Sequence, residues 1–139
     1  MCLVVAISDG DTITVRCGQP DAYEQVKIRL SAIDAPEKRQ PFGNVSRQHL
    51  ARLCFQQLAT ITAKSRDRYG RMIADVECNG KDASAYQVDS GLAWFYVRYG
   101  KGYEHLAELE IIAKHARLGV WSAEAVPPWE WRRNSKRQR

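Results

Sequence analysis

The chain has 139 residues, enough for one domain with its own hydrophobic core and without a metal or disulfide to hold it together. Its composition, 45% hydrophobic and 27% charged, is that of a globular protein and excludes a disordered or a membrane-spanning chain. The net charge of +5 belongs to the end of the chain, because residues 132–139 hold five basic residues and no acid. We therefore expect one domain over residues 1–131 and a basic, flexible tail over residues 132–139.

The first half of the chain predicts three strands and then a helix. Residues 3–7 and 12–17 flank an Asp9-Gly10 turn, and residues 26–33 form a third β-type segment. Asn44 is a candidate N-cap for the helix that follows. That helix would place five apolar residues near one face, namely Val45, Leu50, Leu53, Cys54 and Leu58.

The second half predicts two more strands and two more helices. Residues 59–63 and 72–78 have strand character on either side of "KSRDRYGR". Residues 84–87 have the form of a capping box that opens a short helix before Gly91, and a last helix covers residues 104–118 before Gly119. Five strands with a helix after the third predict an α+β, mainly β fold, a five-stranded Greek-key barrel of the oligonucleotide-binding (OB) type with three α-helices.

Four cysteines, Cys2, Cys17, Cys54 and Cys78, show no zinc-ligand spacing and allow three disulfide connectivities. A two-residue turn at Asp9-Gly10 would set Cys2 opposite Cys17, close to the geometry of a disulfide. A longer loop through "DGDT" would shift that register. We expect partly buried thiols, with the Cys2–Cys17 bridge as the second interpretation.

Charged residues gather in two short stretches. Asp9 and Asp11 lie in "DGDT", where turn chemistry alone explains them, and an EF-hand loop is excluded because its fifth position is Ile13. Arg29, Asp34 and Glu37 lie in "IRLSAIDAPE", which could also be a strand end followed by a solvated turn.

Arg29 and Asp34 are five residues apart, so an unbroken strand would point them to opposite faces. They can share a site only if the strand ends or bulges before Asp34. The Ala35-Pro36 pair makes such an end plausible and would leave the Ala35 carbonyl as an oxygen ligand. Two carboxylates and a carbonyl suit a hard cation such as calcium, and they do not suit zinc.

Five motifs carry a family resemblance in the order that the family shows: "DGDT", "IRLSAIDAPE", "DRYGR", "SGLAW" and "LGVWS". The chain resembles the staphylococcal (micrococcal, thermonuclease) nuclease family over nearly its whole length. That family folds as a five-stranded OB barrel with three helices.

The resemblance implies a role for each matching residue. Asp11 and Asp34 would bind Ca²⁺ through their carboxylates and Ala35 through its carbonyl, while Arg29 and Arg71 grip the scissile phosphate and Glu37 acts on the attacking water as a base or by orienting it. Arg68 and Tyr69 match positions that touch a neighbouring terminal phosphate, although a solvated loop explains them equally well. Of two family tyrosines beneath the nucleotide, one matches Tyr99 and the other is Val97 here, so Tyr96 becomes the alternative if the register shifts.

The resemblance thus implies a calcium-dependent nuclease that hydrolyses DNA and RNA and leaves 3'-phosphate and 5'-hydroxyl ends. We expect a monomer that prefers single strands and has no membrane partner. The alternative is a non-catalytic OB module that holds single strands through its basic tail and aromatic residues. The intact set of charged side chains favours the enzyme.

Location follows from the same chemistry. A nuclease that needs calcium is better placed outside the cytoplasm, where calcium is plentiful. We expect a secreted or periplasmic protein whose signal peptide is not part of this chain, or a cytoplasmic one if Met1 is the native start.

Overall fold

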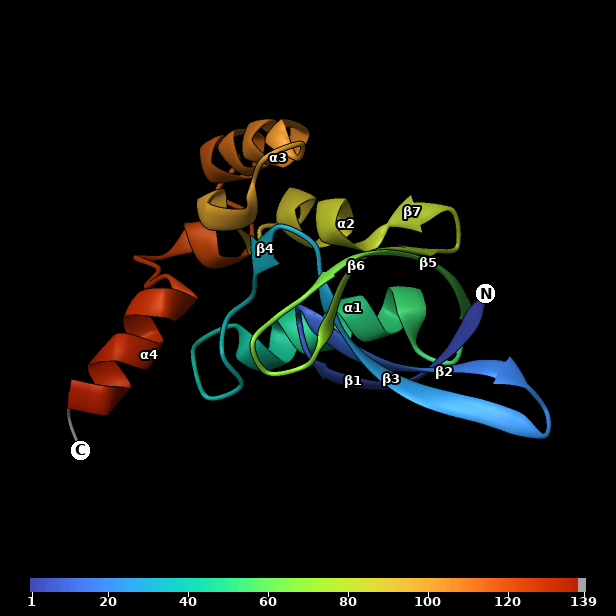
Figure 1. Cartoon of the computed structure of the whole chain (residues 1–139). Coiled ribbons are helices and arrows are strands. Elements are labelled where there is room, and N and C mark those ends of the chain that lie inside the picture. The colour runs from blue at the N-terminus through green and yellow to red at the C-terminus, as the bar shows by residue number, and fades with distance from the viewer. Residues whose placement is uncertain (138–139) are drawn as a thin grey trace.

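The computed structural model describes residues 1–137 and contains a closed β-barrel (Figure 1). Its long strands are β1 (Cys2–Asp9), β2 (Thr12–Gln19), β3 (Ala22–Leu30), β5 (Leu58–Arg66) and β6 (Met72–Cys78). They pair in the order β3-β2-β1-β5-β6, and a parallel pairing of β3 with β6 closes the barrel. The five-stranded α+β barrel of the OB type predicted from the sequence is therefore confirmed.

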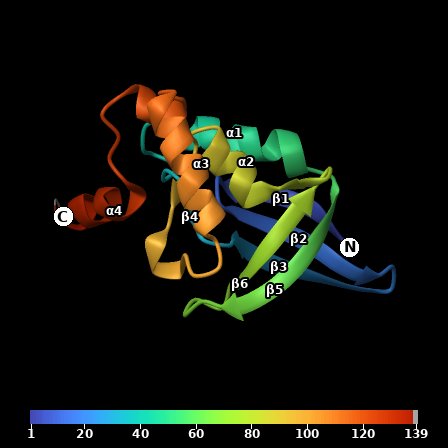
Figure 2. The same ribbon diagram turned by 90° about the horizontal axis from the view of Figure 1, so that it is seen from above.

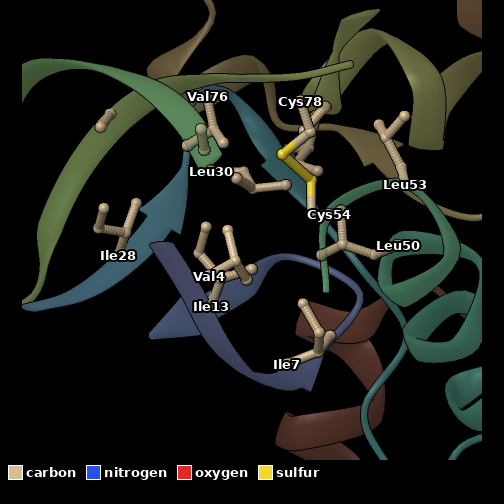
Figure 3. Close-up of a cluster of buried hydrophobic side chains, with 14 of the residues drawn as sticks. Val4, Ile7, Ile13, Ile28, Leu30, Leu50, Leu53, Cys54, Val76 and Cys78 are labelled. Atoms are coloured by element: carbon tan, nitrogen blue, oxygen red, sulfur yellow. A yellow bond between two sulfur atoms is a disulfide. The ribbon is translucent and has the colours of Figure 1, made fainter. Parts of the chain in front are cut away.

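The barrel interior is filled by the alternating apolar residues of its strands (Figure 3). Ile13 and Val15 of β2 point inward, as do Ile28 and Leu30 of β3. Each such side chain contributes about 1.5–3 kcal/mol when it is fully buried. Because the strands bury their inward faces in one shared core, the strand ends and turns are fixed relative to one another at the mouth of the barrel.

Within residues 1–137, four α-helices accompany the barrel, one more than predicted. They are α1 (Gly43–Cys54), α2 (Ala83–Asp89), α3 (Glu104–His115) and α4 (Pro128–Arg137). In Figures 1 and 2, α4 lies at the end of the molecule opposite the tip of the β2–β3 hairpin. Among residues 1–137, no helix is both long enough and apolar enough to cross a membrane.

Shorter elements complete the chain. β4 (Ile33–Asp34) pairs with β8 (Trp94–Phe95) in a separate two-stranded sheet, and β7 (Lys81–Asp82) extends the edge of β6. Two 3₁₀ turns, η1 (Val97–Tyr99) and η2 (Gly119–Ser122), flank α3.

The ends of α1 differ from the prediction. Its N-cap is Phe42 rather than Asn44, and no side chain caps it. Gly43 begins the helix against the carbonyls of Glu37 and Lys38, which leave no room for a Cβ atom. The helix ends at Cys54, so Leu58 falls in β5 and lies exposed, and tertiary packing has overridden the apolar pattern here.

The start of α2 also differs by two residues. Asp82 is the N-cap, and its carboxylate accepts a hydrogen bond from Ala85 N. Ser84, predicted to cap, instead donates its hydroxyl to the Ser31 carbonyl. Gln87 is buried and donates to the Gly10 carbonyl. The polar residues of the expected capping box therefore fasten α2 to the barrel mouth.

The expectation of unpaired thiols was wrong. Cys2 is bonded to Cys17 and Cys54 to Cys78, and no cysteine is left over (Figure 3 shows the second bond). The hairpin turns at Gly10-Asp11, one residue later than predicted, but two irregularities in β1 restore the register, so that Leu3 faces Arg16. Cys2 and Cys17 therefore meet across the strands as the simpler turn would have placed them.

We expect the Cys2→Ala/Cys17→Ala double variant to lose about 3 kcal/mol of unfolding free energy, because the bridge closes a loop of about 15 residues in the unfolded chain. Urea unfolding without reductant measures the loss. Both cysteines are only partly buried, so the substitutions leave no large cavity. Four reactive thiols in the denatured wild-type protein would contradict the pairing.

Candidate active site

Asp11 lies in the turn between β1 and β2, and its carboxylate is fixed there by hydrogen bonds. Its side chain is 5% exposed, its Oδ2 accepts from Ala35 N at 2.8 Å, and its Oδ1 accepts from the Thr12 hydroxyl at 2.8 Å. Gly10 packs against the Ser46 side chain so closely that a Cβ atom would not fit. The "DGDT" sequence thus builds a rigid turn that fixes one carboxylate beside Ala35.

The third strand breaks where the sequence required it to break. β3 ends at Leu30, Ala32 adopts a left-handed backbone with φ of 61°, and β4 begins at Ile33. Asp34 thereby turns to the same side as Arg29, and Arg29 Nη2 lies 3.5 Å from Asp34 Oδ1. Arg29 also donates to the Ile33 carbonyl at 3.3 Å, which fixes its guanidinium near the carboxylate.

These groups open onto a cleft of about 640 Å³. Eight of the nine predicted site residues line it: Asp11, Arg29, Asp34, Glu37, Arg68, Tyr69, Arg71 and Tyr99. The ninth, Ala35, is buried and joined to Asp11 through its N–H. Eight further residues line the cleft. Tyr96 was predicted only as the alternative to Tyr99, and the other seven were not predicted as site residues: Asp9, Ser65, Arg66, Asp67, Ile73, Arg98 and Arg132.

Asp67 organises the turn between β5 and β6. Its Oδ1 accepts from the main-chain N–H groups of Tyr69 and Arg71, and its Oδ2 accepts from Arg71 Nε at 2.7 Å. Burial alone would raise the pKa of Asp67, but these hydrogen bonds lower it. Because Arg71 is tied through Nε, the Nη edge of its guanidinium is the part that it can offer to a phosphate. Tyr69 is 75% exposed at the tip of the turn.

Two tyrosines form the other wall. Tyr99 is half exposed, its ring centroid lies 5.3 Å from that of Tyr96, and both residues line the cleft. Val97, the departure from the family pattern, is largely exposed and is not among the lining residues. Tyr96 was the alternative under a shifted register, and the structure brings both rings together.

The carboxylates of the cleft influence one another strongly. Burial and the neighbouring charge of Asp11 raise the pKa of Asp9 to about 8, so Asp9 is largely protonated at neutral pH. Burial alone would raise the pKa of Asp11, but hydrogen bonds with Asp9 and Ala35 and the nearby Arg29 guanidinium lower it. Burial raises the pKa of Asp34 against the opposing effect of Arg132, and the charge of Asp11 adds to the rise.

Arg132 is the residue that sequence reasoning missed most clearly, because it belongs to the segment expected to be a flexible tail. Residues 132–137 instead continue α4, whereas residues 138–139 of the expected tail lie outside the described residues. Arg132 Nη2 lies 2.7 Å from Asp34 Oδ2, and Nη1 contacts Glu37. The Pro127-Pro128 pair was a usable signal, since proline is favoured in the first turn of a helix.

The chemistry of these donors fits a hard cation. Residues 1–137 contain no group of three or more His, Cys, Asp or Glu side chains arranged to hold a metal. The proposed ligands are two carboxylates and one main-chain carbonyl, and oxygen ligands of this kind suit calcium. Burial is the main cause of the raised pKa of Asp34, and the charge of Asp11 adds to it; this repulsion between the two carboxylates is the interaction that a bound cation would relieve.

Comparison with known proteins agrees with this geometry. The family model described as "Staphylococcal nuclease homologue" matches residues 27–123. This chain belongs to the staphylococcal nuclease family. The matched segment of the family contains Arg29, Asp34, Glu37 and Arg71, begins after Asp11, and ends before α4.

Individual relatives within the family cover more of the chain. A protein named micrococcal nuclease from Shigella flexneri is 41% identical over 96% of this chain and 80% of its own length. An uncharacterized endonuclease of Escherichia coli O157:H7 is 40% identical over 93% of this chain and 82% of its own length. Staphylococcal-like nuclease CAN1 of Arabidopsis thaliana is 39% identical over 81% of this chain but only 35% of its own length.

Proposed function

We propose that the protein is a monomeric, calcium-dependent nuclease that hydrolyses phosphodiester bonds of DNA and RNA, prefers single strands, and leaves 3'-phosphate and 5'-hydroxyl ends. The observation that carries the proposal is one cleft lined by two arginines, Arg29 and Arg71, and by the buried carboxylates of Asp11 and Asp34. The names of the relatives, micrococcal nuclease and endonuclease, agree with a nucleic-acid-cleaving enzyme.

The arginines suit the charge that develops during phosphodiester cleavage. Negative charge builds on the phosphate oxygens, and a planar guanidinium can donate two parallel hydrogen bonds to them. Arg29 is held by Asp34 and the Ile33 carbonyl, and Arg71 by Asp67, so little reorganisation is needed when the phosphate arrives. Pre-fixed donors of this kind favour the transition state over the ground state.

Glu37 and the cation complete the proposed mechanism. Asp11, Asp34 and the Ala35 carbonyl would hold calcium. Its positive charge would stabilise the negative charge that develops on the phosphate oxygens in the transition state. Glu37 lines the same cleft, where it can accept a proton from the attacking water or orient that water. Attack on phosphorus with loss of the 5' oxygen gives a 3'-phosphate and a 5'-hydroxyl.

The remaining cleft residues would hold the strand. Tyr96 and Tyr99 offer aromatic faces on which any base can stack, with little sequence preference. Arg68 and Tyr69 lie on the β5–β6 turn at the cleft edge, within reach of a phosphate that neighbours the scissile one. Stacking on exposed rings requires unpaired bases, which supports the preference for single strands.

We expect cleavage of single-stranded DNA with calcium, none with a chelator, and little with magnesium. Magnesium demands near-octahedral coordination and loses its water reluctantly, whereas calcium tolerates an irregular set of protein oxygens. The test incubates end-labelled single-stranded DNA with each ion and resolves fragment length and end groups. Equal rates with both ions would contradict the proposed site, and binding without any cleavage would favour the non-catalytic OB module.

Helix α4 adds a basic surface beside the cleft. A second cavity, of about 510 Å³, is lined by Tyr69, Trp129, Arg132, Arg133 and Lys136. Tyr69 and Arg132 also line the catalytic cleft, so the two cavities adjoin. A strand that leaves the cleft past Tyr69 would meet the positive charges of α4.

We expect the Arg133→Gln/Lys136→Gln variant to bind single-stranded DNA more weakly than the wild type. The slope of log K against log salt concentration should become shallower by about 1.4, which is about 0.7 for each of two lost phosphate contacts. The measurement is fluorescence anisotropy at several salt concentrations. Arg52→Gln/Lys81→Gln is the matched control, because it removes the same charge from exposed positions that line neither cavity. Equal slopes for the two variants would remove α4 from the substrate path.

We also propose that the protein works in an exported, oxidising compartment. Both cysteine pairs form disulfides, and such bonds persist in secreted and periplasmic proteins but are rare in the cytosol. Recovery of the protein from periplasmic or culture fractions, with no reactive thiols, tests this location.

A further inference from the structure

Arg132 contacts two carboxylates of the cleft. Its two Nη atoms donate to the two oxygens of Asp34, at 2.7 and 3.3 Å, and Nη1 also contacts Glu37. Asp34 is 1% exposed, whereas the Arg132 side chain is 40% exposed. The guanidinium therefore lines the cleft and covers a buried carboxylate.

The position of Arg132 is set by the packing of α4, not by the ion pairs alone. One turn earlier, the Trp129 ring lies 5.7 Å from Tyr96 and 6.4 Å from Trp94, centroid to centroid. Before the helix, the Val126 carbonyl accepts from Gln40 Nε2, which ties the start of α4 to the segment after Glu37. These contacts hold the helix so that Arg132 points at Asp34.

An ordinary stabilising ion pair does not account well for this arrangement. A buried carboxylate needs a compensating positive charge, and Arg29 is already within 3.5 Å of Asp34. Arg132 donates to both Asp34 oxygens, so either oxygen that a calcium ion would take as a ligand is already hydrogen-bonded. The pair also crosses 98 residues of sequence and joins α4 directly to the catalytic cleft.

We propose that Arg132 is a built-in competitor of the catalytic cation, occupying Asp34 until calcium displaces it. The inference rests on the proposed function, since it takes Asp34 to be a calcium ligand. Because Arg132 donates to both oxygens of Asp34, a calcium ion must compete for a ligand atom that is already in use, and the positive charge of Arg132 repels a second cation at the same place. Opening of the Arg132 contact therefore favours calcium binding.

The competition sets the calcium concentration at which the site fills. When a binding-competent state is only partly populated, the apparent dissociation constant rises in inverse proportion to its population. If Arg132 covers Asp34 about nine-tenths of the time, calcium binds about tenfold more weakly than it would without Arg132. The displaced guanidinium lies between the two adjoining cavities, where a substrate phosphate can receive it.

The test measures calcium affinity directly, by isothermal titration calorimetry of the full chain without nucleic acid. We expect Arg132→Gln to bind calcium about threefold to tenfold more tightly than the wild type, and Arg132→Lys to lie between them because lysine keeps the charge but loses the fork. Arg133→Gln is the matched control: it removes the same charge from the next residue of α4, and it should change the affinity less than twofold. Asp34→Asn should abolish the binding and so mark the site.

Three results would overturn the inference. Equal affinities for wild type and Arg132→Gln, or weaker binding by the variant, would mean that Arg132 supports the ligands and does not compete for them. The same gain in Arg133→Gln would assign the effect to long-range charge. No calcium binding by either wild type or Arg132→Gln would overturn the proposed cation site as well. Urea unfolding of each variant confirms that the protein titrated is folded.

Discussion

Replacing Arg29 or Arg71 by lysine should lower the cleavage rate at saturating calcium and DNA by about 10- to 100-fold. Lysine keeps the positive charge but cannot donate two parallel hydrogen bonds to a phosphate. One charge-assisted hydrogen bond contributes about 1.5–3 kcal/mol, which corresponds to this range of rates. Single-turnover cleavage of a labelled oligonucleotide measures the chemical step without product release.

The two arginines should differ in what else changes. Arg71→Lys also removes the 2.7 Å bond from Arg71 Nε to Asp67, which shapes the β5–β6 turn, so DNA affinity should fall together with the rate. Arg29→Lys leaves that turn intact. Arg52→Lys, at an exposed position on α1 outside the cleft, is the control for general effects of the substitution. Rates within threefold of the wild type would remove the arginine concerned from the catalytic assignment.

Local sequence patterns were sufficient for the barrel, whereas the predicted roles of the site residues came from the family resemblance and stay predictions. Strand periodicity located the five long strands, because each buries one face in the same core. The requirement that Arg29 and Asp34 share a site, although five residues apart, correctly implied a break before Asp34. The break is the left-handed Ala32, a position for which the sequence carries no glycine signal.

The features that were missed depend on contacts between distant parts of the chain. The apolar pattern predicted that Val45 is buried on α1, but Val45 is half exposed. Gly43 packs against the Glu37 and Lys38 carbonyls, and this contact orients the start of the helix with Val45 toward solvent. The Cys54–Cys78 bond joins the end of α1 to β6, and spacing along the chain does not specify such a meeting.

The helix over residues 132–137 was not predicted, for a related reason. Eight polar and basic residues in a row resemble a solvated tail when they are considered alone. In the structure Trp129 docks against Tyr96 and Trp94, and this docking extends the helix through Arg132. Trp94 of β8 and Tyr96 after it form this docking surface, and they reach Trp129 only in the folded barrel. A helix here could therefore not be predicted before the fold was known.

The second large effect concerns Glu37. We expect Glu37→Gln to lower the single-turnover cleavage rate by about 10²- to 10⁴-fold, the contribution typical of a positioned general base. Glutamine keeps the size of the side chain and can still orient water through its carbonyl oxygen, but it cannot accept a proton. A loss in this range therefore favours proton transfer, whereas a loss below about tenfold would leave Glu37 only an orienting role.

The control for Glu37→Gln must account for Arg132, which contacts Glu37 as well as Asp34. Removing the Glu37 charge frees part of that guanidinium and could strengthen its hold on Asp34, which would weaken calcium binding and imitate a catalytic defect. Rates are therefore compared at calcium concentrations that saturate each variant, and Arg132→Gln/Glu37→Gln is measured beside Arg132→Gln. If Glu37 acts on the water itself, Glu37→Gln should lower the rate by the same factor in the wild type and in Arg132→Gln. At saturating calcium the cation site is filled in both, so competition for Asp34 no longer affects the rate. Recovery of activity in the double variant would assign the defect to Arg132 and would leave the proton acceptor to be sought elsewhere in the cleft.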